Sequence, residues 1–216
     1  MQYRTILFDL DGTLTDPFEG ITRSVQYAAQ HFGIIEPDLE KLRGFIGPPL
    51  EAELCRYFRL SPEQGKIALQ KYRERFSTVG IFENKVYPGI RDLLSALHER
   101  GATLAIASSK PHIYVNRILE HFDLAKYFKA VSGSELSGER VVKSEAIRYA
   151  LELLEIEPSR EVLMVGDRVH DAIGAFSVGL PFVGVRYSYA APDEFNSVAN
   201  IYVADTVSQL SEFLLK

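Results

Sequence analysis

The chain has 216 residues, of which 46% are hydrophobic and 25% charged, and this balance argues against a disordered or collagen-like protein. Its 24 Lys and Arg against 29 Asp and Glu give a net charge of −5, without the basic excess of a nucleic-acid-binding surface. The single cysteine, Cys55, allows no intramolecular disulfide, and no apolar run reaches the roughly 18 residues of a membrane span. We therefore expect a cytoplasmic protein with neither a nucleic-acid polymer nor a membrane as partner. The oligomeric state is not predictable from these features.

Short apolar runs alternate with helical patterns along most of the chain. Because these runs are continuously apolar, they predict strands buried on both faces, as in a parallel sheet covered by helices. The alternation is typical of an α/β fold, here a Rossmann-like, doubly wound parallel sheet. The expected strands are Arg4–Asp9, Thr103–Ala107, Phe128–Val131, Glu161–Val165, Pro181–Val185 and Ile201–Val203, and the expected helices are Ile90–His98, His112–Phe122, Ser144–Leu154, Asp171–Ser177 and Val207–Leu215.

One region breaks this alternation, because only helical patterns occur from about Glu19 to about Ser77. Apolar residues recur at helical spacing over Ile21–Phe32 and again over Ala68–Val79. The tetrapeptide Ser61-Pro62-Glu63-Gln64 combines an N-cap serine, a first-turn proline and a capping-box glutamine, which together start a helix. We therefore predict an α-helical domain over residues 16–85, inserted into an α/β core formed by residues 1–15 and 86–216.

Two acidic residues lie where the first expected strand ends, in the segment Asp9-Leu10-Asp11-Gly12-Thr13. Residues two apart in an extended chain point to the same side, so Asp9 and Asp11 can face one site. Their carboxylates repel each other unless a cation or a proton lies between them, and Gly12 lets backbone N–H groups approach a ligand closely. The segment fits a nucleophile and an acid/base beside a divalent metal. Taken alone, it fits a solvated acidic turn equally well.

Three further motifs follow other expected strands. Asp167 and Asp171 lie one helical turn apart just after an expected strand, and carboxylate oxygens at the end of a strand suit Mg²⁺. Helix capping is nevertheless the commoner role of acids at such positions. Ser108 and Ser109 close the second strand, where a hydroxyl and free amides either hold a phosphate or simply cap a helix. Lys143 lies near the start of a helix, where a cation can neutralise a phosphoryl group, although most lysines are solvated surface residues.

These motifs share a position, since each follows a core strand, and ligands bind in the crevice at the carboxyl ends of strands in open α/β sheets. With the residues in this order, the chain resembles the haloacid dehalogenase superfamily along nearly its full length. The most specific match is Asp9-Leu10-Asp11-Gly12-Thr13-Leu14. The helical insertion resembles the cap of that family, which closes over the active site.

The resemblance implies a Mg²⁺-dependent phosphatase that acts on a small phosphorylated metabolite through an aspartyl-phosphate intermediate. Asp9 would be the nucleophile, and Asp11 the general acid and then the general base. Ser108 and Lys143 would hold the transferring phosphoryl group. In having an acid at the position of Asp11, the chain resembles the phosphatases of the superfamily. The dehalogenases and phosphonate hydrolases of the superfamily lack an acid there.

The resemblance also implies a metal site and a set of substrate contacts. Asp167 would bind Mg²⁺ together with the nucleophile and the backbone carbonyl of the acid/base residue, and Asp171 would support these ligands. Gly12 and Ser109 would contact the substrate beside the phosphoryl group. Arg43 precedes the turn Gly44–Pro49, which either connects two helices or carries this arginine to an anionic substrate.

The substrate class rests on the resemblance alone. The segments Leu14–Ile21, Phe45–Leu50 and Gly166–Asp171 are similar to a 5′-nucleotidase-like branch near the phosphoglycolate phosphatases. This similarity implies a nucleoside 5′-monophosphate as substrate, with phosphoglycolate as the alternative. Two other classes stay open, namely a sugar phosphomutase with the same aspartate pair and a non-catalytic binding protein.

Overall fold

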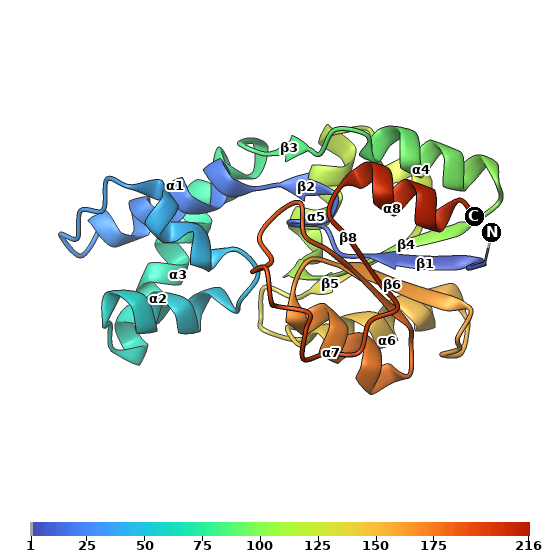
Figure 1. Cartoon of the computed structure of the whole chain (residues 1–216). Helices are drawn as coiled ribbons and strands as arrows, with labels where there is room; N and C mark the ends of the chain where they lie inside the picture. Colours follow the sequence, from blue (N-terminus) through green and yellow to red (C-terminus); the bar gives the residue numbers. More distant parts are fainter. Residues whose placement is uncertain (1) are drawn as a thin grey trace. The chain divides into compact units, whose positions relative to one another are not determined.

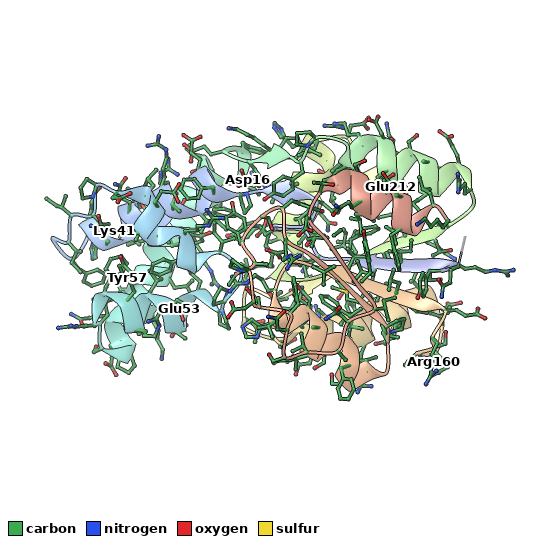
Figure 2. The ribbon with its side chains drawn as sticks, viewed as in Figure 1. Asp16, Lys41, Glu53, Tyr57, Arg160 and Glu212 are labelled. Carbon is green, nitrogen blue, oxygen red and sulfur yellow. The ribbon has the colours of Figure 1, made fainter. Side chains whose placement is uncertain are left out.

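The computed structural model describes residues 2–216, which form two units. Among these residues, the first unit comprises 2–16 and Val86–Lys216, and the second comprises Pro17–Lys85. Figure 2 labels side chains of both, with Asp16, Arg160 and Glu212 in the first unit and Lys41, Glu53 and Tyr57 in the second.

A parallel sheet forms the centre of the first unit (Figure 1). Its strands are β1 (Thr5–Phe8), β4 (Thr103–Pro111), β5 (Phe128–Ser134), β6 (Val162–Gly166), β7 (Phe182–Val185) and β8 (Tyr202–Ala204). They are arranged in the order β5-β4-β1-β6-β7-β8, and every neighbouring pair is parallel. Every residue of β6 and β7 is buried, as expected of strands that are covered on both faces.

Helices cover both faces of this sheet. The helices α4 (Ile90–Glu99) and α8 (Val207–Leu214) lie on one face, and α6 (Lys143–Leu154) and α7 (Val169–Val178) lie on the other (Figure 1). A further helix, α5 (His112–His121), packs against β4 and β5. The prediction of a doubly wound α/β fold is therefore confirmed. The core beneath α6 and α7 includes Leu7, Ala105, Ile147, Met164 and Ala175.

The predicted elements are present, but several of their ends differ. β4 runs to Pro111, beyond the predicted end at Ala107, because Pro111 pairs with Ser134 of β5 after an irregularity that follows Ala107. α7 begins at Val169, two residues before the predicted start at Asp171. The reason is that the side chain of Glu194 accepts the N–H of Val169 at 2.8 Å, which satisfies one of the free donors of the first turn.

The strand order reverses beside β1. The chain builds β4 and β5 on one side of β1 and then crosses to build β6, β7 and β8 on the other. The carboxyl ends of β1 and β6 therefore form a topological switch point, which is where ligands bind in open α/β sheets. Asp9 directly follows β1, and Asp167 directly follows β6.

The second unit is helical. It contains α1 (Phe18–Gln30), α2 (Leu50–Phe58) and α3 (Pro62–Phe76), with α3 packed against both of the others. α3 begins as the sequence predicts, because Ser61 and Gln64 form a reciprocal capping box. The helix ends before Val79, which is half exposed and does not continue the predicted apolar face. Within residues 2–216, no helix combines the length and apolarity needed to cross a membrane.

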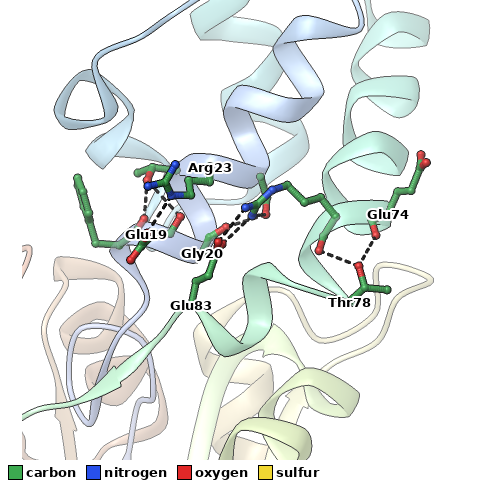
Figure 3. Close-up of polar contacts among 10 residues, drawn as sticks. Glu19, Gly20, Arg23, Glu74, Thr78 and Glu83 are labelled. Atoms are coloured by element: carbon green, nitrogen blue, oxygen red, sulfur yellow. Dashed lines mark hydrogen bonds and ion pairs between the residues drawn. The ribbon is translucent and has the colours of Figure 1, made fainter.

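Short contacts join the first and last parts of the second unit (Figure 3). The N–H of Gly20 donates to the main-chain oxygen of Glu83 at 2.9 Å. The guanidinium of Arg75 donates to both carboxylate oxygens of Glu83, at 2.7 and 2.9 Å. A Cβ at Gly20 would lie 2.0 Å from the carbonyl oxygen of Gly80, so only glycine permits this close approach. Two short strands, β2 (Thr15–Asp16) and β3 (Lys85–Val86), pair where the chain passes between the units.

Candidate active site

Three acidic side chains meet at the carboxyl ends of β1 and β6. Asp9, Asp167 and Asp171 each offer a carboxylate oxygen, and these oxygens lie within 4.8 Å of one another. All three residues are buried. The register of the sheet explains their proximity, because the N–H of Asp9 donates to the carbonyl oxygen of Val165 in β6 at 2.9 Å. Residues that are distant in sequence thus become neighbours at one edge of the sheet.

Lys143 stands between two of these acids. Its Nζ lies 2.8 Å from Oδ1 of Asp9 and 2.7 Å from Oδ1 of Asp171, and it donates to the carbonyl oxygen of Ala107 at 3.1 Å. Burial by itself lowers the pKa of Lys143, but the adjacent Asp171 and Asp9 raise that pKa above its usual value. A Cβ at Gly174 in α7 would lie 2.7 Å from Cγ of Lys143, so a glycine there makes room for the lysine.

Asp167 is held by one oxygen only. Its Oδ2 accepts the hydroxyl of Ser188 at 3.1 Å, whereas its buried Oδ1 has no hydrogen-bond partner among residues 2–216. Burial, together with Asp171 and Asp9, raises the pKa of Asp167 well above its ordinary value. A Cβ at Gly12, whose φ is +82°, would lie 2.1 Å from Oδ2 of Asp167, so this position requires glycine.

These features fit a divalent cation such as Mg²⁺. A buried carboxylate oxygen without a hydrogen-bond partner needs a proton or a cation, and carboxylate oxygens are the ligands that Mg²⁺ prefers. Asp171 is already held by Lys143 and by the N–H of Arg168, at 3.0 Å, so Asp9 and Asp167 are the better placed ligands. This assignment agrees with the chemistry of Mg²⁺, which binds through one or two carboxylates and keeps waters or phosphate oxygens.

A second ion pair involves Asp11. Its Oδ2 lies 2.5 Å from Nζ of Lys110, and both side chains are largely buried. Burial raises the pKa of Asp11, while the positive charge of Lys110 opposes that shift. Lys110 was not among the predicted site residues, because the strand was predicted to end at Ala107. β4 contains both Ser108 and Lys110, which are two residues apart. Residues at this spacing in an extended segment point to the same side, so a longer predicted strand would have indicated Lys110 as a site residue.

The two serines near the end of β4 lie at the edge of the sheet where the strands have their carboxyl ends. Ser108 is buried, and its Oγ accepts the N–H of Lys110 at 3.3 Å. Ser109 is half-buried, and its carbonyl oxygen accepts the hydroxyl of Ser134 at 2.8 Å. Arg43 belongs to the second unit, where its Nη1 lies 3.8 Å from Oε2 of Glu40.

The segment between β7 and β8 donates hydrogen bonds to residues of the site and accepts others beside it, and these contacts were not predicted from the sequence. The hydroxyl of Tyr187 donates to the carbonyl oxygen of Thr13 at 2.7 Å, and Ser188 donates to Asp167. Burial and the nearby Asp167 raise the pKa of Tyr187, so its hydroxyl remains a donor. Oε1 of Glu194 accepts a hydrogen bond from Nε of Arg168 at 2.9 Å and thereby fixes the start of α7.

Comparison with known proteins agrees with this geometry. Residues 6–185 match the family model of the haloacid dehalogenase-like hydrolases. A 5′-nucleotidase of Pseudomonas aeruginosa is 47% identical over 197 residues, which cover 91% of this chain and 89% of that protein. The tyrosine-protein kinase PtkA of Mycobacterium tuberculosis is 36% identical over 211 residues, 97% of this chain and 72% of that protein. The crystal structure of a predicted phosphatase from Clostridium acetobutylicum matches with a TM-score of 0.94 at 44% identity. The match covers 100% of this chain and 99% of that one.

Proposed function

This chain belongs to the haloacid dehalogenase-like hydrolase family and is a phosphatase, and on that premise we propose that it hydrolyses nucleoside 5′-monophosphates through an aspartyl-phosphate on Asp9. The observation that carries the mechanism is the cluster at the carboxyl ends of β1 and β6. It combines a buried nucleophile, a second carboxylic acid two residues later and a buried ammonium. A nucleophile with a neighbouring acid/base is the arrangement that covalent catalysis needs.

In the first half of the proposed reaction, a carboxylate oxygen of Asp9 attacks the phosphorus atom. The bond between phosphorus and the leaving oxygen breaks, and Asp11 gives that oxygen a proton. Lys143, which is already 2.8 Å from Asp9, offsets negative charge on the transferring group. Mg²⁺ held by Asp9 and Asp167 would add further positive charge beside the phosphoryl oxygens.

In the second half, water hydrolyses the aspartyl-phosphate. Asp11 takes a proton from the water as its oxygen bonds to phosphorus, and the bond to Asp9 breaks to release inorganic phosphate. The covalent intermediate divides a difficult displacement into two easier steps, and Asp11 serves the first as an acid and the second as a base. The burial of Ser108 beside Lys110 supports a role for its hydroxyl in holding the phosphoryl group in both steps.

The substrate proposal is supported by the 47% identity to a protein named 5′-nucleotidase. The cluster of the first unit addresses phosphate and metal only, so it does not itself distinguish one phosphomonoester from another. The test is phosphate release, with Mg²⁺ present, from nucleoside 5′-monophosphates, with the 3′-isomers as matched controls. We expect a higher kcat/KM for the 5′-isomers. A higher kcat/KM for phosphoglycolate would replace this substrate by the alternative.

Transfer to an acceptor other than water is the competing outcome. A relative with 36% identity is named a tyrosine-protein kinase, and a phosphomutase would return the phosphoryl group to a sugar. Asp11 is a buried acid/base beside the nucleophile and can activate water, but it can activate a sugar hydroxyl in the same way, so the product has to be measured. Measurement of inorganic phosphate against phosphorylated product decides between them. A stoichiometric yield of inorganic phosphate supports hydrolysis, and a phosphorylated acceptor without free phosphate contradicts it.

A further inference from the structure

The ion pair between Lys110 and Asp11 has no role in the reaction as described so far. Nζ of Lys110 lies 2.5 Å from Oδ2 of Asp11, and the two side chains are 7% and 13% exposed. An ion pair removed from water gains Coulomb energy but loses hydration, so it is weak evidence for a contribution to stability. An effect on the reaction is the better explanation for a buried lysine beside an acid/base.

The two carboxylate oxygens of Asp11 differ in their surroundings. Oδ2 contacts Lys110, whereas Oδ1 is buried and has no hydrogen-bond partner among residues 2–216. If the proton of the acid is on Oδ1, Oδ2 still accepts from the ammonium, because a carboxylic acid keeps a free carbonyl oxygen. The contact therefore persists in both protonation states and leaves the same atom available for proton transfer.

We propose that Lys110 is a positioning residue, which holds Asp11 by Oδ2 so that Oδ1 is the atom that exchanges the proton. In the first half-reaction, Oδ1 gives its proton to the leaving oxygen as Asp9 bonds to phosphorus. In the second, Oδ1 takes a proton from water as the water oxygen bonds to phosphorus and the bond to Asp9 breaks. This inference rests on the proposed function, because it assigns a partner to the acid/base of that reaction.

The consequence is different for the two half-reactions and depends on the leaving group. A weakly basic leaving group, such as 4-nitrophenolate, departs without a proton, so its release needs no acid. Hydrolysis of the aspartyl-phosphate needs the base whatever the leaving group was. Loss of Lys110 should therefore slow the second half-reaction for every substrate and the first half-reaction only for alkyl phosphates.

The experiment is rapid-mixing kinetics of Lys110→Met with 4-nitrophenyl phosphate and with an alkyl phosphate. With the aryl ester we expect a burst of one equivalent of 4-nitrophenolate per site at close to the wild-type rate. The steady state that follows should be slower by about 10²-fold, the lower end of the range for general acid–base catalysis. With the alkyl ester we expect slow turnover and no burst. Lys110→Arg, which keeps a charged donor, should restore most of the steady-state rate.

Lys126→Met is the matched control, because Lys126 also lies 2.5 Å from an aspartate, Asp123, but in an exposed pair of the same unit. It should leave both phases unchanged. Equal loss of burst and steady state in Lys110→Met would overturn the proposal in favour of a structural role. Weaker inhibition by inorganic phosphate with a slower burst would assign Lys110 to phosphate binding instead. Unchanged kinetics would also overturn it.

These outcomes are separate from failure of the proposed function. If the wild-type protein releases no phosphate from any ester, the reaction itself is wrong and the inference falls with it. If the wild type is active and only the variants behave otherwise than expected, the inference alone is wrong. Should Lys110→Met not fold, Lys110→Gln carries the test, because this polar but uncharged side chain should still slow the steady state more than the burst.

Discussion

Nζ of Lys143 lies 2.8 Å from Oδ1 of Asp9, although 134 positions separate the two residues in the chain. The same ammonium lies 2.7 Å from Asp171, so one buried cation serves carboxylates from two different motifs. Since Lys143 begins α6 and Asp9 follows β1, this contact ties the helix that covers one face of the sheet to the candidate nucleophile. The nucleophile is thereby fixed in orientation before any substrate binds.

Asp9→Asn tests that nucleophile. The amide has nearly the same shape but no negative charge with which to attack phosphorus, so turnover should fall at least ~10³-fold, the scale on which loss of a nucleophile acts. Phosphate release at saturating substrate measures the effect. Asp193→Asn, on an exposed residue of the same unit, is the control and should retain wild-type activity. An Asp9→Asn variant that keeps more than about a tenth of the activity would disprove this role.

How far the site was predictable depends on the local pattern around each residue. The continuous apolar runs of β1 and β6 end at Asp9 and near Asp167, so the sequence could place both acids at the same edge of a parallel sheet. Lys110 was missed because apolarity ends before β4 does, and a polar strand end carries no distinguishing pattern. Predicting where such a strand ends requires knowledge of its pairing with β5.

The contacts of Ser188 and Glu194 were unpredictable for a different reason. Both residues lie in an irregular segment, and their partners, Asp167 and Arg168, are more than 20 positions away. No periodicity connects a loop residue to a distant partner, since the contact depends on how the complete sheet brings the two loops together. The strand order therefore had to be known before these supporting residues could be assigned.

Removal of divalent metal should abolish activity. If Asp9 and Asp167 hold Mg²⁺, EDTA should reduce phosphate release to background and added Mg²⁺ should restore it. Ca²⁺ should inhibit, because it is larger and accepts looser coordination than the octahedral geometry of Mg²⁺. Mn²⁺ binding, followed by electron paramagnetic resonance, gives a readout independent of turnover. Full activity in excess chelator would contradict the metal site.

Asp167→Asn should make the metal-free protein more stable. Burial and the adjacent Asp171 and Asp9 raise the pKa of Asp167 above its unfolded value of 3.8. A carboxyl group whose pKa is higher in the folded state than in the unfolded state stabilises the fold only while it is protonated. Its contribution to stability is therefore lost as the pH rises from the unfolded-state pKa through the folded-state pKa. At neutral pH the asparagine removes this cost, and the free energy of unfolding in urea should increase. Mg²⁺ should then stabilise the wild type but not the variant, and equal effects on both would contradict this.

Ser188→Ala should weaken metal binding without changing the chemistry. The hydroxyl holds Oδ2 of Asp167 at 3.1 Å and so orients the ligand. Loss of such an outer hydrogen bond typically lowers metal affinity by about 10- to 100-fold. The Mg²⁺ concentration for half-maximal activity and the Kd for Mn²⁺ should both rise, while kcat at saturating Mg²⁺ stays close to that of the wild type. Ser208→Ala, on an exposed residue of α8, is the control. A lower kcat with unchanged metal affinity would contradict the assignment.

Arg43→Ala tests where substrate selectivity arises. In the proposed reaction the residues of the first unit address phosphate and metal only. Discrimination between phosphomonoesters would then come from a surface that meets the rest of the substrate, and we predict that the helical unit supplies it. The guanidinium is half exposed and only 3.8 Å from Glu40, an ion pair of little energetic worth. The variant should raise KM for the best nucleotide and lower kcat/KM by about 1–3 kcal/mol, the worth of one charge-assisted hydrogen bond.

The comparison that isolates this effect uses a small aryl phosphate, which offers no group beyond the ring for Arg43 to meet, so its hydrolysis should remain nearly unchanged. Lys41→Ala is the matched control, since Lys41 is an exposed cation of the short 3₁₀ helix Leu39–Phe45 that also contains Arg43, and it pairs with Glu36. Equal losses with both substrates would assign Arg43 to phosphoryl chemistry or to folding. No change with either would mean that the turn after Arg43 only connects two helices and that selectivity arises elsewhere in Pro17–Lys85.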